Sequence, residues 1–250
     1  MIRQLRWEQT SYWRNPAAAS FTFAFPLLFL VVFTAINGND TVHLSGQPVK
    51  FAQFYVPAIL AFGVISACYT NLAFTLSNRR ESGLLKRVRG TPLPPLTYLG
   101  GIGLNSIVVA TILSVLVTVL GLVAYGITFP GRYLGLVVTI AIGALCFSAL
   151  GALVSTIVPN EDAAPAVINF ILFPMLFISG TFGRVDDGTT LAKIADVFPV
   201  RHLNEQMIAV FDPGAHGTGI HLVDSAVLLA WAAAAGLLAA RRFRWDPRAG

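Results

Sequence analysis

Residues Asn78–Pro95 read NRRESGLLKRVRGTPLPP, a basic stretch between two long apolar runs, 52–77 and 98–125. Apolar runs of this length are typical of membrane-spanning helices, which need roughly 20 residues to cross the hydrocarbon core. A short basic segment between two such runs predicts an element at the membrane surface that contacts a partner. The stretch sets five bases against the single acid Glu81: Arg79, Arg80, Lys86, Arg87 and Arg89.

The composition of the whole chain indicates a membrane protein. Its 250 residues are 55% hydrophobic and only 12% charged, with a mean hydropathy of +0.70, whereas soluble domains carry about 25% charged residues. The formal net charge is +5. The basic residues gather at the ends of the apolar runs, which favours a role in membrane topology over nucleic-acid binding. We therefore predict an all-α polytopic membrane protein that binds no nucleic acid.

Six apolar runs are long enough to cross a bilayer: 17–37, 52–77, 98–125, 133–158, 163–182 and 222–240. This order places alternate connecting segments on the same side of the membrane as the N-terminus. Four segments on that side hold 12 of the 17 Lys and Arg residues: 1–16, 78–97, 159–162 and 241–250. The asymmetry follows the positive-inside rule, so we expect both termini to be cytoplasmic.

Two segments outside the spans mix apolar and polar residues. Residues 1–15 interleave aromatic and basic side chains, a pattern typical of a helix that lies in the membrane interface. Segment 183–221 repeats apolar residues at helical spacing on both sides of Pro199. It predicts two amphipathic helices that re-enter the outer leaflet between the fifth and sixth spans. The alternative is a small extracellular cap.

Within the basic stretch, Asn78 and Glu81 have the spacing of a capping box, and Gly90 and the prolines after it favour a stop. We expect a helix of about three turns with its leucines toward the protein or membrane and its bases toward the cytoplasm. The alternative is a charge cluster that sets topology, with an interfacial helix held by anionic lipid.

The spans contain almost no ionisable groups. Asp224, near the start of the sixth, is the exception. Transporters that use an ion gradient need such groups at membrane depth, so energy for any transport should come from elsewhere. The chain has no G-x-x-x-x-G-K-[ST] phosphate-binding motif. We expect neither an enzyme nor a nucleotide site in this chain.

Three patches resemble one known family. Arg80-Glu81, Gly83, Leu84, Lys86-Arg87, Arg89 and Thr91-Pro92-Leu93-Pro94 are similar to the RE-x-G-x-L-x-R…TPL loop of the ABC type 2 membrane family. Residues 179–182 (SGTF) resemble its SGxFF ending of the fifth span, and residues 198–203 (FPVRHL) resemble its PLxHL segment. This family comprises the permease subunits of drug-, antibiotic- and lipid-exporting ABC transporters. A proline usually follows the SGxFF segment, whereas here Gly183-Arg184-Val185-Asp186 follows.

The resemblance implies a single permease domain over residues 1–250, in a bacterial inner membrane. It implies a dimer with an identical or paralogous permease, two separate ATP-binding subunits that hold ATP and Mg, and a role in multidrug, antibiotic or lipid efflux. The coupling helix that receives the motion of the ATPase would comprise Arg79, Arg80, Glu81, Gly83, Leu84, Lys86, Arg87, Arg89, Thr91 and Pro92. A second cytoplasmic contact would comprise Asn160, Glu161 and Asp162.

The same resemblance places the substrate path along the second and fifth spans. It would be lined by Asn71, Phe74, Asn169, Phe173 and Phe177, a mixture that suits an amphiphilic cargo. The alternative is that the asparagines bond neighbouring helices and the phenylalanines face lipid.

Other functions are weighed on the remaining residues. The four histidines, His43, His202, His216 and His221, have no Cys and acid set close in sequence, so we expect no metal site. No catalytic group is expected at membrane depth, which disfavours a lipid enzyme. A membrane scaffold whose basic loop recruits a regulator or anionic lipid is the main alternative to a permease.

Overall fold

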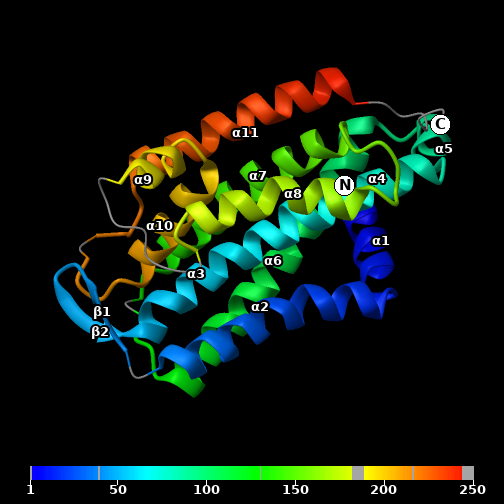
Figure 1. Cartoon of the computed structure of the whole chain (residues 1–250). Coiled ribbons are helices and arrows are strands. Elements are labelled where there is room, and N and C mark those ends of the chain that lie inside the picture. Colours follow the sequence, from blue (N-terminus) through cyan, green and yellow to red (C-terminus); the bar gives the residue numbers. More distant parts are fainter. Residues whose placement is uncertain (1, 39, 130, 182–188, 216, 244–250) are drawn as a thin grey trace.

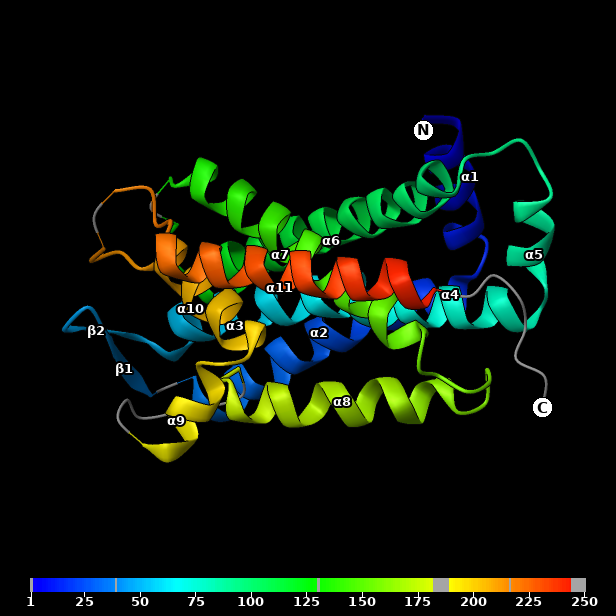
Figure 2. The same cartoon turned by 90° about the horizontal axis from the view of Figure 1, so that it is seen from above.

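A computed structural model describes residues 2–38, 40–129, 131–181, 189–215 and 217–243. Long helices run side by side in a bundle, with a small hairpin at one end and a short helix, α5, at the other (Figures 1 and 2). The longer helices are α1 (Ile2–Trp13), α2 (Pro16–Asn37), α3 (Phe51–Ile65), α4 (Asn71–Glu81), α6 (Pro95–Tyr125), α7 (Tyr133–Ser155), α8 (Ala164–Ile178), α10 (Pro199–Phe211) and α11 (Leu222–Arg242). The shorter ones are α5 (Leu84–Arg89) and α9 (Thr190–Ala195).

Five helical stretches are long and apolar enough to cross a membrane: Ala19–Asn37, Phe51–Glu81, Thr97–Tyr125, Tyr133–Ser155 and Leu222–Arg242. They coincide with five of the six expected spans. The remaining one corresponds to α8, an apolar helix of 15 residues. At 1.5 Å per residue it extends about 22 Å, less than the roughly 30 Å of the hydrocarbon core. Phe182, the last residue expected in that span, lies outside the described residues.

The second of these stretches, Phe51–Glu81, lies at the centre of the bundle. Nearly all of α3 is buried, as expected for a helix that neighbours surround on every side. Between α3 and α4 lies a π-helical turn, η1 (Ser66–Thr70), in which the Asn71 N–H donates to the Ser66 carbonyl, five residues back. Such single π turns are rare and often lie at functional sites.

Helix α7 packs closely against this turn because residue 151 is glycine. A Cβ atom at Gly151 would lie 2.6 Å from the carbonyl oxygen of Tyr69 and 3.2 Å from that of Cys68. On the other side, the Tyr69 hydroxyl lies 3.2 Å from the Ile168 carbonyl oxygen of α8 and donates to it. The π turn is therefore held between α7 and α8.

The described residues are mostly helical, as the sequence predicts, and one small hairpin departs from an all-α fold. Strands β1 (Thr41–Leu44) and β2 (Gln47–Lys50) form an antiparallel hairpin, with Thr41 opposite Lys50 and Leu44 opposite Gln47. The turn uses Ser45 and Gly46, both at positive φ, which matches the right-handed twist of a two-residue hairpin. The Ser45 hydroxyl also bonds the carboxylate of Asp212, after α10. Four-residue strands give too little alternation to be recognised in the sequence.

The two segments expected to be amphipathic do form helices. Helix α1 covers residues 2–13 and exposes Ile2, Trp7 and Trp13, while its place at a membrane interface stays a prediction. Helices α9 and α10 lie in the expected outer segment, and Pro199 begins the second. Helix α10 is amphipathic, as expected, and almost wholly buried against its neighbours, while the re-entry of this segment into the outer leaflet stays a prediction. Residues 183–186 lie outside the described residues.

Candidate functional site

The basic stretch does not begin a helix at Asn78, so the expected capping box is wrong. Asn78 lies inside α4, which continues to Glu81 because Leu76, Ser77 and Arg80 are still buried against the bundle. The helix ends at Ser82, and Gly83 takes a left-handed conformation with φ of +70°, which glycine adopts at no steric cost. The chain then turns into α5, a helix of six residues instead of three turns.

Helix α5 has one buried face and one exposed basic face. Leu85 is fully buried in an apolar cluster whose other buried members come from α4 and α6: Leu72, Leu76, Tyr98 and Ile102. Lys86, Arg87 and Arg89 are exposed, as the sequence predicts. Gly90 ends the helix, also as predicted, and its N–H lies 3.1 Å from the Arg87 carbonyl. A force on α5 would thus be passed through Leu85 to α4 and α6.

Arg79 connects this end of α4 to the N-terminal helix. Its two terminal nitrogens lie 2.8 and 2.7 Å from the two carboxylate oxygens of Glu8 on α1, a bidentate pair. It also lies 3.0 Å from the Tyr98 hydroxyl and stacks over the Trp7 ring at 5.2 Å from its centroid. Glu8 is buried, and it is the only acid before Asp40, a signal that could have shown its importance.

Arg80 connects α4 to the end of α7. Its side chain donates to the carbonyl oxygens of Ser155 and Val158, at 2.8 and 2.6 Å, and pairs with Glu81 at 3.0 Å. These carbonyls belong to the last turn of α7 and the residues after it, where a positive charge is favoured. Arg80 is only 4% exposed. Its side chain therefore holds α4 against the end of α7 and does not form part of the exposed basic surface.

The expected second contact is an exposed turn next to the Arg80 site. Asn160, Glu161 and Asp162 are all exposed. The Asn160 side chain accepts a hydrogen bond of 2.8 Å from the Ala163 N–H, which caps the turn that leads into α8. Because Arg80 holds Val158, two residues before this turn, α4 positions both α5 and residues 160–162.

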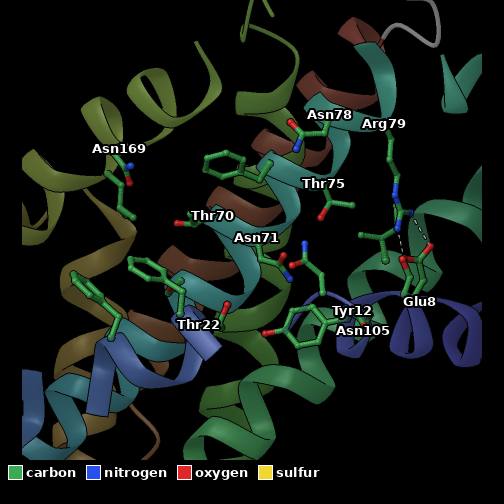
Figure 3. A pocket seen from close by; sticks show the side chains of 18 of the residues that line it. Glu8, Tyr12, Thr22, Thr70, Asn71, Thr75, Asn78, Arg79, Asn105 and Asn169 are labelled. Carbon is green, nitrogen blue, oxygen red and sulfur yellow. Dashed lines mark hydrogen bonds and ion pairs between the residues drawn. The ribbon is translucent and has the colours of Figure 1, made fainter. Parts of the chain in front are cut away.

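A pocket of about 630 Å³ opens beside η1 (Figure 3). Helices α1, α2, α6 and α8 and the central stretch contribute its walls. Four residues that the family resemblance assigned to the substrate path line the pocket: Asn71, Phe74, Asn169 and Phe173. Phe177 is not among the lining residues and is 67% exposed elsewhere on α8.

The pocket combines aromatic and uncharged polar walls. Further aromatic rings come from Phe21, Phe25 and Phe62, and further polar groups from Thr22, Thr70, Thr75 and Asn105. The buried Oδ1 of Asn105 has no hydrogen-bond partner among the described residues. Burial raises the pKa of the Tyr12 phenol in the same wall, so this group stays neutral.

Charged side chains line the pocket at one end only, among the residues that the structure describes. Among the described residues that line it, Glu8 and Arg79 alone are ionised groups, and they neutralise each other. Figure 3 shows this pair at the side of the cluster formed by Asn71, Asn105 and Tyr12. The sequence did not identify Glu8, Thr70 or Asn105 as pocket residues, because contacts between α1, η1 and α6 do not follow from spacing along the chain.

Comparisons with known proteins find a matching family model and several similar permeases. The family described as ABC-2 family transporter protein matches residues 34–241. The chain is similar to the probable multidrug ABC transporter permease YbhR of Escherichia coli K12, with 24% identity over 63% of this chain and 43% of that protein. It is also similar to the inner membrane transport permease YadH of the same strain, with 22% identity over 62% of this chain and 59% of that protein. The matches thus cover about half the length of these relatives.

Proposed function

Because this chain belongs to the ABC-2 family of transporter proteins, we propose that it is the membrane permease subunit of an ABC transporter, driven by a separate ATP-binding subunit. The observation that carries the proposal is α5, whose basic side chains are exposed while Leu85 anchors it in the bundle. In this role α5 is the coupling helix and residues 160–162 form the second contact. The chain itself hydrolyses no ATP.

The arrangement supports two different roles for the bases of this stretch, one group contacting the ATPase and the other contacting the bundle. Lys86, Arg87 and Arg89 meet the ATPase, together with the exposed Thr91 and Pro92. Arg79 and Arg80, which bond Glu8 and the end of α7, transmit the movement into the bundle. The α5 end of the bundle is then cytoplasmic, and so are both termini. The working complex contains two ATP-binding subunits and a second permease.

The pocket supports an amphiphilic cargo. Its aromatic rings suit an apolar body, and its amides and hydroxyls suit a polar group without net charge. We propose a drug-like molecule, an antibiotic or a lipid, moved outward from the cytoplasm or the inner leaflet. YbhR is named as a probable multidrug ABC transporter permease, which supports a drug-like cargo.

Reversing charge on α5 tests the coupling role. The double variant Lys86→Glu, Arg87→Glu is expected to insert and fold normally, since both side chains are exposed. It should lose co-purification with the cognate ATPase, and cargo-stimulated ATP hydrolysis in proteoliposomes should fall at least about tenfold, because two positive charges at the contact become negative. The matched control is Arg241→Glu, Arg242→Glu at the end of α11, which makes the same charge change on exposed side chains.

Normal coupling in the α5 variant would contradict the coupling assignment. Retained coupling together with loss of binding to anionic vesicles would instead indicate a lipid-binding scaffold. Failure of both the variant and the control would show a general effect of lost positive charge.

Two phenylalanines on α8, one turn apart, test the pocket. Phe173→Leu removes an aromatic ring from its wall, whereas Phe177→Leu makes the same change outside it. We expect transport of an aromatic amphiphile to fall about fivefold in the first, because an aromatic pair contributes about 1 kcal/mol, and to stay unchanged in the second. The measurement is uptake into inverted vesicles that contain the ATPase. Equal loss in both variants would exclude this pocket as the binding site.

A further inference from the structure

Two histidines and two carboxylates meet between α10 and the start of α11, at the end of the bundle away from α5 (Figure 1). His202 and Glu205 lie three residues apart on α10. Asp224 lies in the first turn of α11, and His221 precedes that helix. Potential ligand atoms of His202, Glu205 and Asp224 all lie within 4.8 Å of one another. Imidazole nitrogens and carboxylate oxygens are ligands that zinc prefers.

The His202 ring is oriented as a metal ligand usually is. Its Nε2 lies 2.8 Å from the backbone oxygen of Asp196, and a carbonyl oxygen can only accept, so Nε2 carries a hydrogen. Nδ1 therefore points into the cluster, where it lies 2.7 Å from Oδ1 of Asp224 and donates a second N–H to that carboxylate. A bound ion would take the place of this proton on Nδ1. Histidines that bind metals almost always donate their other ring N–H to a carbonyl or a carboxylate. The backbone of Asp196 thus fixes the ring in advance.

Asp224 joins the two histidines. Its second oxygen, Oδ2, lies 3.1 Å from Nδ1 of His221, so both carboxylate oxygens face an imidazole nitrogen. The side chains of His202 and Asp224 are almost buried, whereas His221 is 55% exposed. The cluster consequently has a buried floor and an open side through which an ion can enter.

Glu205 completes the set and is itself held in place. Arg201 Nε lies 2.6 Å from Glu205 Oε1 and 3.0 Å from Asp196 Oδ1. The guanidinium reduces the negative charge that Glu205 offers, but carboxylates that bind metals are commonly hydrogen-bonded in this way. Asp224 supplies the second carboxylate of the set, and both of its oxygens face imidazole nitrogens.

We propose that His202, Glu205 and Asp224 form a site for a divalent transition-metal ion, best matched by zinc, that fastens α10 to α11, with His221 bonded to Asp224 at its open side. Mixed imidazole and carboxylate ligands favour zinc, cobalt or nickel over magnesium and calcium, which prefer oxygen alone. The sequence predicted no metal site because the nearest acid to His202 in sequence, Glu205, needs Asp224, 22 residues away, to complete the group. The site is independent of coupling and of the cargo pocket.

Zinc binding to the purified chain tests the site directly. The full chain, carrying an affinity tag without histidines, is stripped of metal in detergent and titrated with Zn²⁺ and with Mg²⁺ by calorimetry. We expect one Zn²⁺ per chain and no comparable binding of Mg²⁺. Co²⁺ in the same site should show the visible absorption of a four-coordinate ion. His202→Gln and Asp224→Asn are expected to abolish this binding, and His221→Gln to weaken it at least about tenfold.

His43→Gln is the matched control, because His43 is exposed on β1 and outside the cluster. It should bind Zn²⁺ as the unchanged chain does. A thermal unfolding assay separates loss of the site from loss of the fold, since a bound ion raises the unfolding midpoint by mass action. Zn²⁺ should raise the midpoint of the unchanged chain and of His43→Gln, and raise that of the exposed His221→Gln much less. An unchanged chain that binds no Zn²⁺, or binding that persists in both His202→Gln and Asp224→Asn, would overturn the proposal.

Discussion

Arg80→Met is expected to destabilise the protein by about 3–5 kcal/mol, the usual cost of removing one partner from a buried charged network. Methionine keeps much of the aliphatic stem but cannot donate to the carbonyls of Ser155 and Val158, at 2.8 and 2.6 Å in the native structure. These oxygens and the Glu81 carboxylate would lose a donor in a largely buried place. The measurement is the thermal unfolding midpoint in detergent, followed by size-exclusion chromatography.

Two further variants make this result specific to the bonds. Arg80→Lys keeps the charge but replaces the planar fork with a single ammonium group, so it should lie between the unchanged protein and Arg80→Met. Arg87→Met makes the same side-chain change on the exposed face of α5. It should change the free energy of unfolding by no more than about 0.5 kcal/mol. An Arg80→Met variant as stable as Arg87→Met would show that the bonds of Arg80 contribute little to the stability of the fold.

The opposite expectations for Arg80 and Arg87 show that the sequence predicts the charge cluster but not which of its bases is buried. Both residues belong to one charge cluster, and the resemblance assigned both to a coupling element. Charge alone cannot distinguish them, because burial depends on the C-terminal end of α7, which reaches Arg80 from 75 residues away. By contrast, Leu85 and Arg87 could be assigned to opposite faces of α5 from local pattern alone.

The spans show the same limit. Long apolar runs predict their helices because length and composition are local properties. The π turn at Ser66–Thr70 has no comparable signal, since its i to i+5 bonds occur in an unbroken apolar run. Part of the pocket was predicted, but from the family resemblance, which assigned Asn71 and Phe173 to a substrate path. Glu8 and Asn105 enter the pocket only through the packing of α1 and α6.

Gly151→Ala is the second substitution with a large expected effect, because the new Cβ atom would meet backbone instead of a flexible side chain. It would lie 2.6 Å from the Tyr69 carbonyl oxygen, well inside normal contact distance, so α7 and η1 must move apart. Overpacking of this kind costs about 1–3 kcal/mol. In most helices the same change is mildly stabilising, since alanine has the higher helix propensity.

Gly103→Ala provides that reference within this chain. Gly103 lies in α6, and a Cβ there would have nothing within 4 Å, so its midpoint should stay unchanged or rise slightly. A fall of the midpoint in Gly151→Ala alone would therefore measure the contact between α7 and the π turn. Because Thr70 and Asn71, at the end of that turn, line the pocket, the same variant should also lower cargo-stimulated ATP hydrolysis when assayed below its midpoint. Equal behaviour of the two glycine variants would mean that the π turn does not depend on α7 for its position.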